Sequence, residues 1–324
     1  MHFLNDMKKY GHAIEKVASE YRISKFRVDI DCIKCRVLHG ASVSDYIGFS
    51  MFRMNHLERN QFVTGRRSEQ IERLFNTGST EDKEIIGNKW VFNRVFSAFI
   101  QRDWIYASES TNEEIEAFLR CNQNIVVKPL SLSKGVGVYI VKSEQIIQEG
   151  LDAFIQEARE KKLLLEGYIR QHPMLRAVNP SSVNTIRICS VRDRRGEVHI
   201  IGASLRAGGK DMFVDNLHAG GVQYPIDVQS GCICRGGVLF NGEKNILFHP
   251  STKMKMIGLQ IPNWKQVVDV VKEAGKIPAH MRYIGWDIAI TEDGCEIVEA
   301  NYGQGRNGMQ QDGVGKYNMI MQYR

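Results

Sequence analysis

The sequence predicts an α+β protein, in which a helical N-terminal region precedes a mixed portion rich in β-strands. Two observations carry this prediction. Apolar residues near the start of the chain recur at the three- and four-residue spacing of one helix face, as at Tyr10, Ile14 and Val17. From about residue 124 onward, short apolar runs bounded by Gly, Asn or Asp are typical of strands.

The composition is that of an ordinary globular protein. The 324 residues include 43 Lys and Arg against 37 Asp and Glu, which gives a formal charge of +6. This length supports two or three cooperating lobes. No apolar run approaches the roughly 18 to 20 residues of a membrane span, and the N-terminus lacks the apolar core of a signal peptide. We expect a cytoplasmic protein with no membrane span, compatible with a homo-oligomer.

The charge distribution argues against a nucleic-acid-binding protein, and the cysteine content argues against a disulfide-rich one. Basic residues are spread along the chain and nearly matched by carboxylates, so we expect small anionic ligands and no nucleic acid. Seven cysteines in a chain of this size favour reduced thiols. Cys32 and Cys35 form a C-x-x-C near His39, but no second pair has matching spacing, so buried thiols on a helix are favoured over zinc.

The elements are expected in the following order. Residues 1–88 are predicted to be helical. A capping box at Thr111 and Glu114 then starts a helix, and the strands NIVVKP, VYIVK and LLLEGYI follow, with a helix over about 151–161 before the last. A second sheet is expected from the runs NTIRICSV and EVHIIGASL, which a charged turn separates. Asn263 is predicted to cap a helix that starts at residue 264.

The segment GWDIAITEDGCEIVEAN predicts a β-hairpin that carries acidic residues, with its two strands joined at Glu292 to Gly294. A three-residue loop would pair Thr291 with Cys295 and place Asp287 directly opposite Glu299, with Asn301 on the same face. Two carboxylates this close repel each other unless a cation lies between them, and oxygen ligands of this kind suit Mg²⁺ held with substrate phosphates. A two-residue loop would instead put the two acids on opposite faces.

A glycine-rich loop follows Lys128. It carries Ser131, Ser133, Lys134, Gly135 and Gly137, whose backbone N–H groups and lysine charge are suited to phosphates. The loop itself matches neither G-x-x-x-x-G-K-[ST] nor G-x-G-x-x-G, and taken alone it is also typical of a plain hairpin.

In order along the chain, these pieces resemble the ATP-grasp superfamily of ADP-forming ligases. The matching segments are the Asn88-Lys89 helix start, IVVKP, SLSKGVGV, LLLEGYI, NTIRI, GWDIAI and IVEAN. The runs SSVNTIRI and VDNLHAGG are similar to the sugar-transfer associated branch. The resemblance implies an ATP-grasp fold, in which nucleotide lies between two α+β lobes, here residues 89–165 and 166–324, after the helical region 1–88.

The resemblance also implies roles for individual residues. Contacts with the nucleotide are implied for Lys89, Lys128, Ser133, Lys134, Gly135, Gly137, Glu166, Gly167, Tyr168, Ile169 and Asn184. Among these, residues 166–169 would meet adenine, mostly through backbone groups and the side chain of Glu166. Arg187 would stabilise the transferring phosphoryl group, although a structural ion pair is the alternative for an arginine in an apolar strand. Asn216 and His218 would be polar active-site residues, and Asp287, Glu299 and Asn301 would hold Mg²⁺ or Mn²⁺.

The implied activity is that of a carboxylate-amine ligase. ATP would activate a carboxylate as an acyl-phosphate, and an amine would then displace phosphate to form an amide. The branch implies polysaccharide or cell-surface glycan synthesis, with a sugar acid and an amino acid as the small-molecule substrates. The alternatives are phosphotransfer to a hydroxyl acceptor and a sensor that binds ATP without turnover. The sequence leaves open the substrates and the role of residues 302–308.

Overall fold

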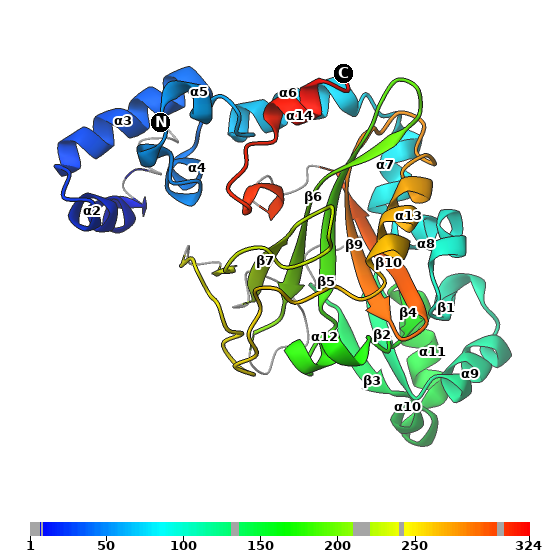
Figure 1. Cartoon of the computed structure of the whole chain (residues 1–324). Helices are drawn as coiled ribbons and strands as arrows, with labels where there is room; N and C mark the ends of the chain where they lie inside the picture. The colour runs from blue at the N-terminus through cyan, green and yellow to red at the C-terminus, as the bar shows by residue number, and fades with distance from the viewer. Residues whose placement is uncertain (1–6, 8, 131–135, 210–220, 240–242, 303–307) are drawn as a thin grey trace.

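The computed structural model describes residue 7 and residues 9–130, 136–209, 221–239, 243–302 and 308–324. Helices surround two antiparallel sheets, which confirms the predicted α+β class (Figure 1). The smaller sheet has the strand order β1-β4-β2-β3, and the larger has the order β10-β9-β5-β6-β7-β8. No helix of the described residues is long and apolar enough to cross a membrane.

Near the start of the described residues, four helices form a cluster, and the first three of them carry the helical residues of its buried core. The four helices are α2 (Gly11–Glu20), α3 (Lys25–His39), α4 (Val43–Gly48) and α5 (His56–Arg59). Ser24 caps α3 through its side chain, and Gly40 ends it at a φ of 66°, where a side chain would be strained. Cys32 and Cys35 are free thiols buried in this core, as predicted. Burial raises the pKa of Cys32 to about 12.

The next three helices pack elsewhere. They are α6 (Gly65–Phe75), α7 (Thr80–Gly87) and α8 (Lys89–Val95). Phe75 of α6 joins a cluster with Tyr283, whereas Ile86 and Phe92 join the main core of the larger sheet. Within the region 1–88 predicted to be helical, hydrophobic packing therefore separates α2, α3 and α4 from the helices after α5. Helix α5 is held to this first group by the ion pair of Arg59 with Asp31.

Three helices cover one face of the smaller sheet. The strands are β1 (Trp104–Tyr106), β2 (Asn124–Pro129), β3 (Tyr139–Lys142) and β4 (Leu163–Gly167), and the helices are α9 (Asn112–Cys121), α10 (Ser143–Glu149) and α11 (Leu151–Glu160). Thr111 and Glu114 form the predicted capping box. Because side chains alternate along a strand, Ile125 and Val127 face the helices, while Lys128 and Glu166 lie on the opposite face.

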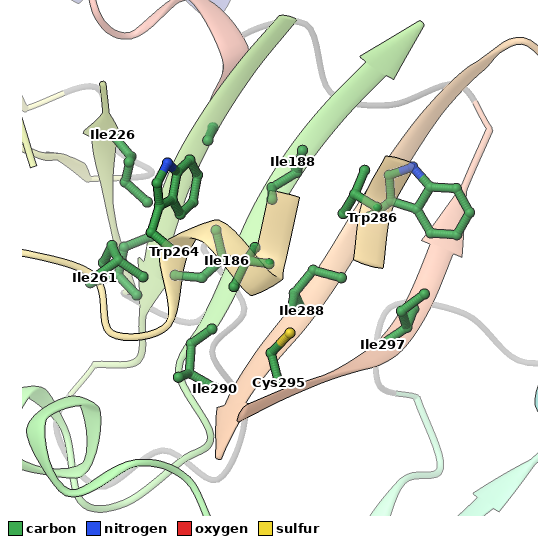
Figure 2. Packing of buried hydrophobic residues seen from close by; sticks show 14 of the residues in the cluster. Ile186, Ile188, Ile226, Ile261, Trp264, Trp286, Ile288, Ile290, Cys295 and Ile297 are labelled. Atoms are coloured by element: carbon green, nitrogen blue, oxygen red, sulfur yellow. The ribbon is translucent and has the colours of Figure 1, made fainter. Parts of the chain in front are cut away.

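The larger sheet carries the main core of the protein. Its strands are β5 (Thr185–Arg192), β6 (Val198–Ala207), β7 (Val222–Ile226), β8 (Val238–Leu239), β9 (Tyr283–Thr291) and β10 (Gly294–Asn301). Figure 2 shows Ile186, Ile188, Trp286 and Ile288 in this core, where helix α13 (Trp264–Ala274) covers the sheet face. The alternate residues, among them Arg187 and Asp287, project from the other face.

The remaining elements are short. They are α12 (Pro173–Val178), α14 (Tyr317–Met321) and the 3₁₀ turns η1 (Met51–Arg53), η2 (Ser97–Phe99), η3 (Ala107–Glu109) and η5 (Gly308–Gln310). One capping prediction is wrong. Asn263 precedes α13 but adopts a left-handed conformation, and its side chain donates to the carbonyl oxygen of Gly294 at 3.2 Å instead of capping the helix.

Candidate functional site

The acidic hairpin has the predicted pairing but not the predicted turn. Gly294 pairs with Thr291, so the loop contains two residues and the expected three-residue loop is wrong. A two-residue turn alone would place Glu299 on the face opposite Asp287. The register shifts, however, between Ile297 and Glu299, because Val298 is an extra residue in β10, and Glu299 thereby lies directly opposite Asp287.

Asp287 is the electrostatic centre of this face. Its side chain is buried, and Arg187 on the neighbouring strand approaches it at 2.7 Å between Nε and Oδ1. Arg206 of β6 donates from Nη1 to both carboxylate oxygens at 3.2 Å. Burial acts to raise the pKa of Asp287, but the charges of Arg187 and Arg206 hold it below the ordinary value. Asp287 is therefore an anion in the folded protein.

Glu299 and Asn301 complete the acidic group. The Asn301 amide nitrogen donates to Glu299 at 3.2 Å and to Asp287 at 3.4 Å. Burial among protein atoms and the charge of Asp287 raise the pKa of Glu299 to about 7, although part of its side chain stays exposed to solvent. Arg187 and Arg206 offset the charge of Asp287, whereas the charge of Glu299 is opposed by that of Asp287, and a proton or a cation on Glu299 relieves this repulsion.

This donor set fits a divalent cation of the kind that the sequence predicts. Asp287 and Glu299 offer carboxylate oxygens, which are ligands that Mg²⁺ prefers. Asn301 turns its amide nitrogen toward both acids in this structure, and a rotation of that amide would offer its oxygen instead. A bound cation would relieve the repulsion that raises the pKa of Glu299.

A second charged group lies on the smaller sheet. The Lys128 ammonium group pairs with the Glu166 carboxylate. The buried Arg102 guanidinium donates to Glu166 at 2.9 Å and to Glu296 of β10 at 2.7 Å. Arg102 thereby connects the smaller sheet to the larger one, and it holds Glu166 beside Lys128.

The Glu166 carboxylate is fully occupied by protein donors. One oxygen accepts from Asn93 at 2.8 Å and from Arg102 at 3.1 Å, and the other accepts from Arg102 and Lys128. Burial acts to raise its pKa, but Arg102 and Lys128 hold it well below the ordinary value. This occupancy argues against the expected contact between the Glu166 carboxylate and adenine, and favours a role in positioning Lys128.

Lys89 lies near both the pair of Lys128 with Glu166 and the acidic hairpin. Its ammonium group donates to the carbonyl oxygen of Pro129 at 3.0 Å, at the end of β2. Burial and the charge of Lys128 lower the pKa of Lys89, whereas Glu299 and Glu166 act to raise it. Lys89 therefore lies within electrostatic reach of both the lysine-bearing strand and the acidic hairpin.

Two backbone N–H groups at the end of β4 already donate hydrogen bonds within the protein. The Gly167 N–H donates to Asp103 at 2.8 Å and the Tyr168 N–H donates to Asn124 at 3.1 Å. Ile169 is buried. Neither of these two N–H groups is free for adenine, so contacts by this segment would use its carbonyl oxygens or Ile169.

Asn184 does not join the acidic group. Its side chain is buried and donates to Gln171 Oε1 at 2.9 Å, the Leu175 oxygen at 2.8 Å and the Asn179 oxygen at 3.0 Å. Its amide oxygen accepts from the Gly208 N–H at 3.4 Å. In the structure, Asn184 is a buried linker between β5 and the end of β6.

Several predicted residues lie outside the described part of the chain. They are Ser133, Lys134, Gly135, Asn216 and His218. Gly137 is described and has a φ of 73°, a left-handed conformation that favours glycine.

Sequence reasoning missed four residues that organise the site: Asn93, Arg102, Arg206 and Glu296. Arg206 has the signal that marked Arg187, a guanidinium inside an apolar strand. Glu296 likewise interrupts the apolar run of β10. Arg102 and Asn93 lie in segments with no such pattern, and only the contacts of Glu166 reveal them.

A basic surface pocket is separate from these groups. Arg192, Arg194, Lys276 and Arg282 line it at the turn between β5 and β6. It lies at the end of β5 away from Arg187.

Many solved structures are similar to this chain at low sequence identity, among them three ligases or synthetases. ATP-grasp ligase PsnB, complexed with a phosphomimetic variant of a minimal precursor, Mg and ADP, is 12% identical, with 79% of this chain and 64% of that chain covered and a TM-score of 0.45. D-Alanine-D-alanine ligase from Helicobacter pylori is 13% identical, with 74% and 60% covered and a TM-score of 0.44.

The third similar structure is N5-carboxyaminoimidazole synthetase from Staphylococcus aureus complexed with ADP. It is 8% identical, with 79% of this chain and 57% of that chain covered and a TM-score of 0.49. This chain thus spans less than two thirds of each of the three.

No curated protein matches the chain. The sequence profile of one family, described as sugar-transfer associated ATP-grasp, matches residues 66–316, which is most of the chain. The match contains Lys89, Lys128, Arg187, Asp287 and Glu299, the residues around which the site is built. The protein therefore belongs to the sugar-transfer associated ATP-grasp family.

Proposed function

We propose that the protein is an ATP- and Mg²⁺-dependent, ADP-forming ligase that joins a carboxylate to an amine through an acyl-phosphate. The pairing of Asp287 with Glu299 beside Arg187 carries this proposal, because it brings two carboxylates that could hold a cation next to a guanidinium on one sheet face. Family membership supports the use of ATP. Residues 89–165 would be the small lobe and residues 166–324 the large lobe, with the nucleotide between them.

The two charged groups would have different roles, one in binding the nucleotide phosphates and the other in binding Mg²⁺. Lys89 and Lys128 would bind the nucleotide phosphates, and the loop of residues 131–138 would cover them. Asp287, Glu299 and Asn301 would hold Mg²⁺, which supplies positive charge to the phosphates when bound. Arg187 would stabilise the negative charge that develops on the transferring phosphoryl group. Glu166, held by Arg102, would keep Lys128 in place.

The proposed chemistry requires no side-chain nucleophile. The substrate carboxylate attacks the γ-phosphorus, and the bond to the β-γ bridging oxygen breaks, so that ADP leaves and an acyl-phosphate forms. The amine then attacks the acyl carbon and phosphate leaves. The residues contribute charge and orientation, and they limit water that would hydrolyse the acyl-phosphate. The family's association with sugar transfer supports a setting in polysaccharide or glycan synthesis. In that setting the substrates would be a sugar acid and an amino acid.

The test is ADP release from Mg²⁺-ATP against a panel of sugar acids and amino acids, supplied singly and in pairs. We expect release that requires an acid and an amine together, with an amide as product. Hydroxylamine in place of the amine should trap the acyl-phosphate as a hydroxamate. The Glu299→Gln variant should lose the activity, whereas Glu292→Gln, at an exposed position in the turn of the same hairpin, should keep it.

The other outcomes contradict the proposal in distinct ways. Phosphorylation of a hydroxyl acceptor, with no acid required, would identify a phosphotransferase. Tight ATP binding without release of ADP across the panel would favour a nucleotide sensor.

A further inference from the structure

Helix α3 has an apolar row on its solvent side. Phe26, Ile30, Ile33 and Val37 follow the spacing of one helix face, and 72%, 36%, 43% and 64% of their respective surfaces are exposed. We call these four residues the α3 ridge. The opposite face of the helix is buried in the N-terminal core through Val28, Cys32, Cys35 and His39.

The α3 ridge is therefore not the core-facing side of an amphipathic helix. A helix at the surface normally presents polar residues to water, and a contiguous row of exposed apolar residues marks an interaction site. Leu38 and Leu57, 62% and 73% exposed, extend the apolar surface near the end of α3. The His39 and His56 rings, 4.8 Å apart, place α5 beside that end of the helix.

The position of the α3 ridge separates it from the catalytic lobes. Figure 1 shows α3 at the outer edge of the N-terminal helices, away from both sheets. The family match begins only at residue 66, so α2 to α5 lie outside it. Lys244 holds this helical cluster to the rest of the chain through the Ile47 oxygen at 3.1 Å and Ser50 Oγ at 2.9 Å.

Charge beside the ridge indicates an anionic partner. Arg27 and Lys34 are exposed and lie seven residues apart, so they line one flank of the ridge. Asp29 and Arg36, also seven apart, line the other flank with opposite charges. Asp31 is engaged within the cluster by Arg59 at 2.7 Å. The first 60 residues carry ten Lys and Arg against seven Asp and Glu, half of the net charge of the protein.

Size and charge argue against a second copy of the chain on this surface. Twelve helical residues extend only about 17 Å, and a stable dimer buries about 800 Å² on each partner. An antiparallel pair of α3 helices would also bring Arg27 and Lys34 against the same two cations of the other copy. A convex apolar ridge with a cationic flank fits a lipid surface better, because apolar side chains enter the headgroup boundary while Lys and Arg contact anionic headgroups.

We propose that the α3 ridge docks the protein on bilayers that contain anionic lipids, through Phe26, Ile30, Ile33 and Val37 with Arg27 and Lys34 at the flank. The catalytic lobes would then work beside the membrane surface without spanning the bilayer. This inference does not depend on the reaction proposed above.

The test is flotation of the full chain with vesicles of phosphatidylcholine alone and of phosphatidylcholine mixed with phosphatidylglycerol. We expect binding to the mixed vesicles that weakens as salt is added. Phe26→Ser with Val37→Ser should weaken this binding about tenfold or more, because both apolar anchors are removed. Arg27→Ser with Lys34→Ser should weaken it for the mixed vesicles and remove most of its salt dependence.

The matched control removes two apolar side chains of similar exposure elsewhere, Phe248→Ser with Val314→Ser, at 52% and 49%. This control should bind like the unmodified protein, and equal thermal unfolding temperatures establish that each variant folds. Absence of binding to the mixed vesicles, or equal binding by the Phe26 and Val37 variant, overturns the proposal. A concentration-dependent dimer in sedimentation equilibrium that the same variant dissolves would assign the α3 ridge to a second copy instead.

Discussion

The Glu299 carboxylate faces that of Asp287 because Val298 is an extra residue in β10, which restores a pairing that the two-residue turn alone would shift by one. The bulge places both acids, Asn301 and Arg187 on one face of the sheet. Bulges redirect side chains in this way and are frequent next to active sites.

Glu299→Gln should weaken the binding of Mg²⁺ about tenfold or more in the presence of a non-hydrolysable ATP analogue, because a charged oxygen ligand is lost. Titration calorimetry measures the affinity. Glu292→Gln is the control, since it removes an exposed carboxylate from the turn of the same hairpin. Unchanged Mg²⁺ affinity in the Glu299 variant would show that the acid pair does not bind the metal.

Lys128→Met should weaken ATP binding about tenfold to a hundredfold, because a hydrogen bond between charged groups contributes roughly 1.5 to 3 kcal/mol. Adenosine, which has no phosphates, should bind the variant and the unmodified protein equally. Lys142→Met on the adjacent strand, at an exposed position, serves as the control. If adenosine binding falls as much as ATP binding, Lys128 acts on the pocket as a whole and not on the phosphates.

Arg102→Met should destabilise the protein by about 3 to 5 kcal/mol, because it leaves Glu166 and Glu296 buried without their guanidinium partner. Chemical unfolding monitored by fluorescence measures the change. Arg120→Met removes an arginine from an exposed pair with Glu116 and should cost less than about 1 kcal/mol. A similar small effect for both variants would mean that the buried network contributes little to stability.

The lowered pKa of Glu166 predicts that the stability of the fold depends on pH. Its folded pKa lies well below the ordinary 4.5, because Arg102 and Lys128 outweigh the effect of burial. A carboxyl group with a depressed folded pKa stabilises the fold above its unfolded pKa, and this contribution is lost as the pH falls through and below 4.5. The difference in unfolding temperature between the unmodified protein and Glu166→Gln should therefore be largest near neutral pH and shrink below pH 4.5. A difference that stays constant over this range would contradict the shifted pKa.

The local elements could be predicted because their causes are local. Thr111 and Glu114 form a capping box three residues apart, and the alternation in TIRICSVR reflects a strand with one apolar face. Family membership also rests on residues whose order is visible in the sequence. The roles proposed for Lys89, Lys128, Arg187 and the acidic group remain predictions.

Other features depend on contacts between distant segments. The turn length of the acidic hairpin was predicted wrongly, since nothing in the sequence of β10 marks Val298 as a bulge. Arg102 and Glu296 are 194 residues apart and meet only when the two sheets approach each other.

Periodicity, capping and motif order are properties of short segments, and for that reason the residues alone predict the α+β class, the family and the acidic hairpin as a candidate metal site. Contacts in the folded chain are needed to show that Asp287 and Glu299 share a face, that Glu166 is enclosed by Arg102, Lys128 and Asn93, and that the α3 ridge faces solvent. Each of these features depends on separate segments of the chain that come together only when it packs. Burial and charge pairing contribute to stability only once these segments are in contact.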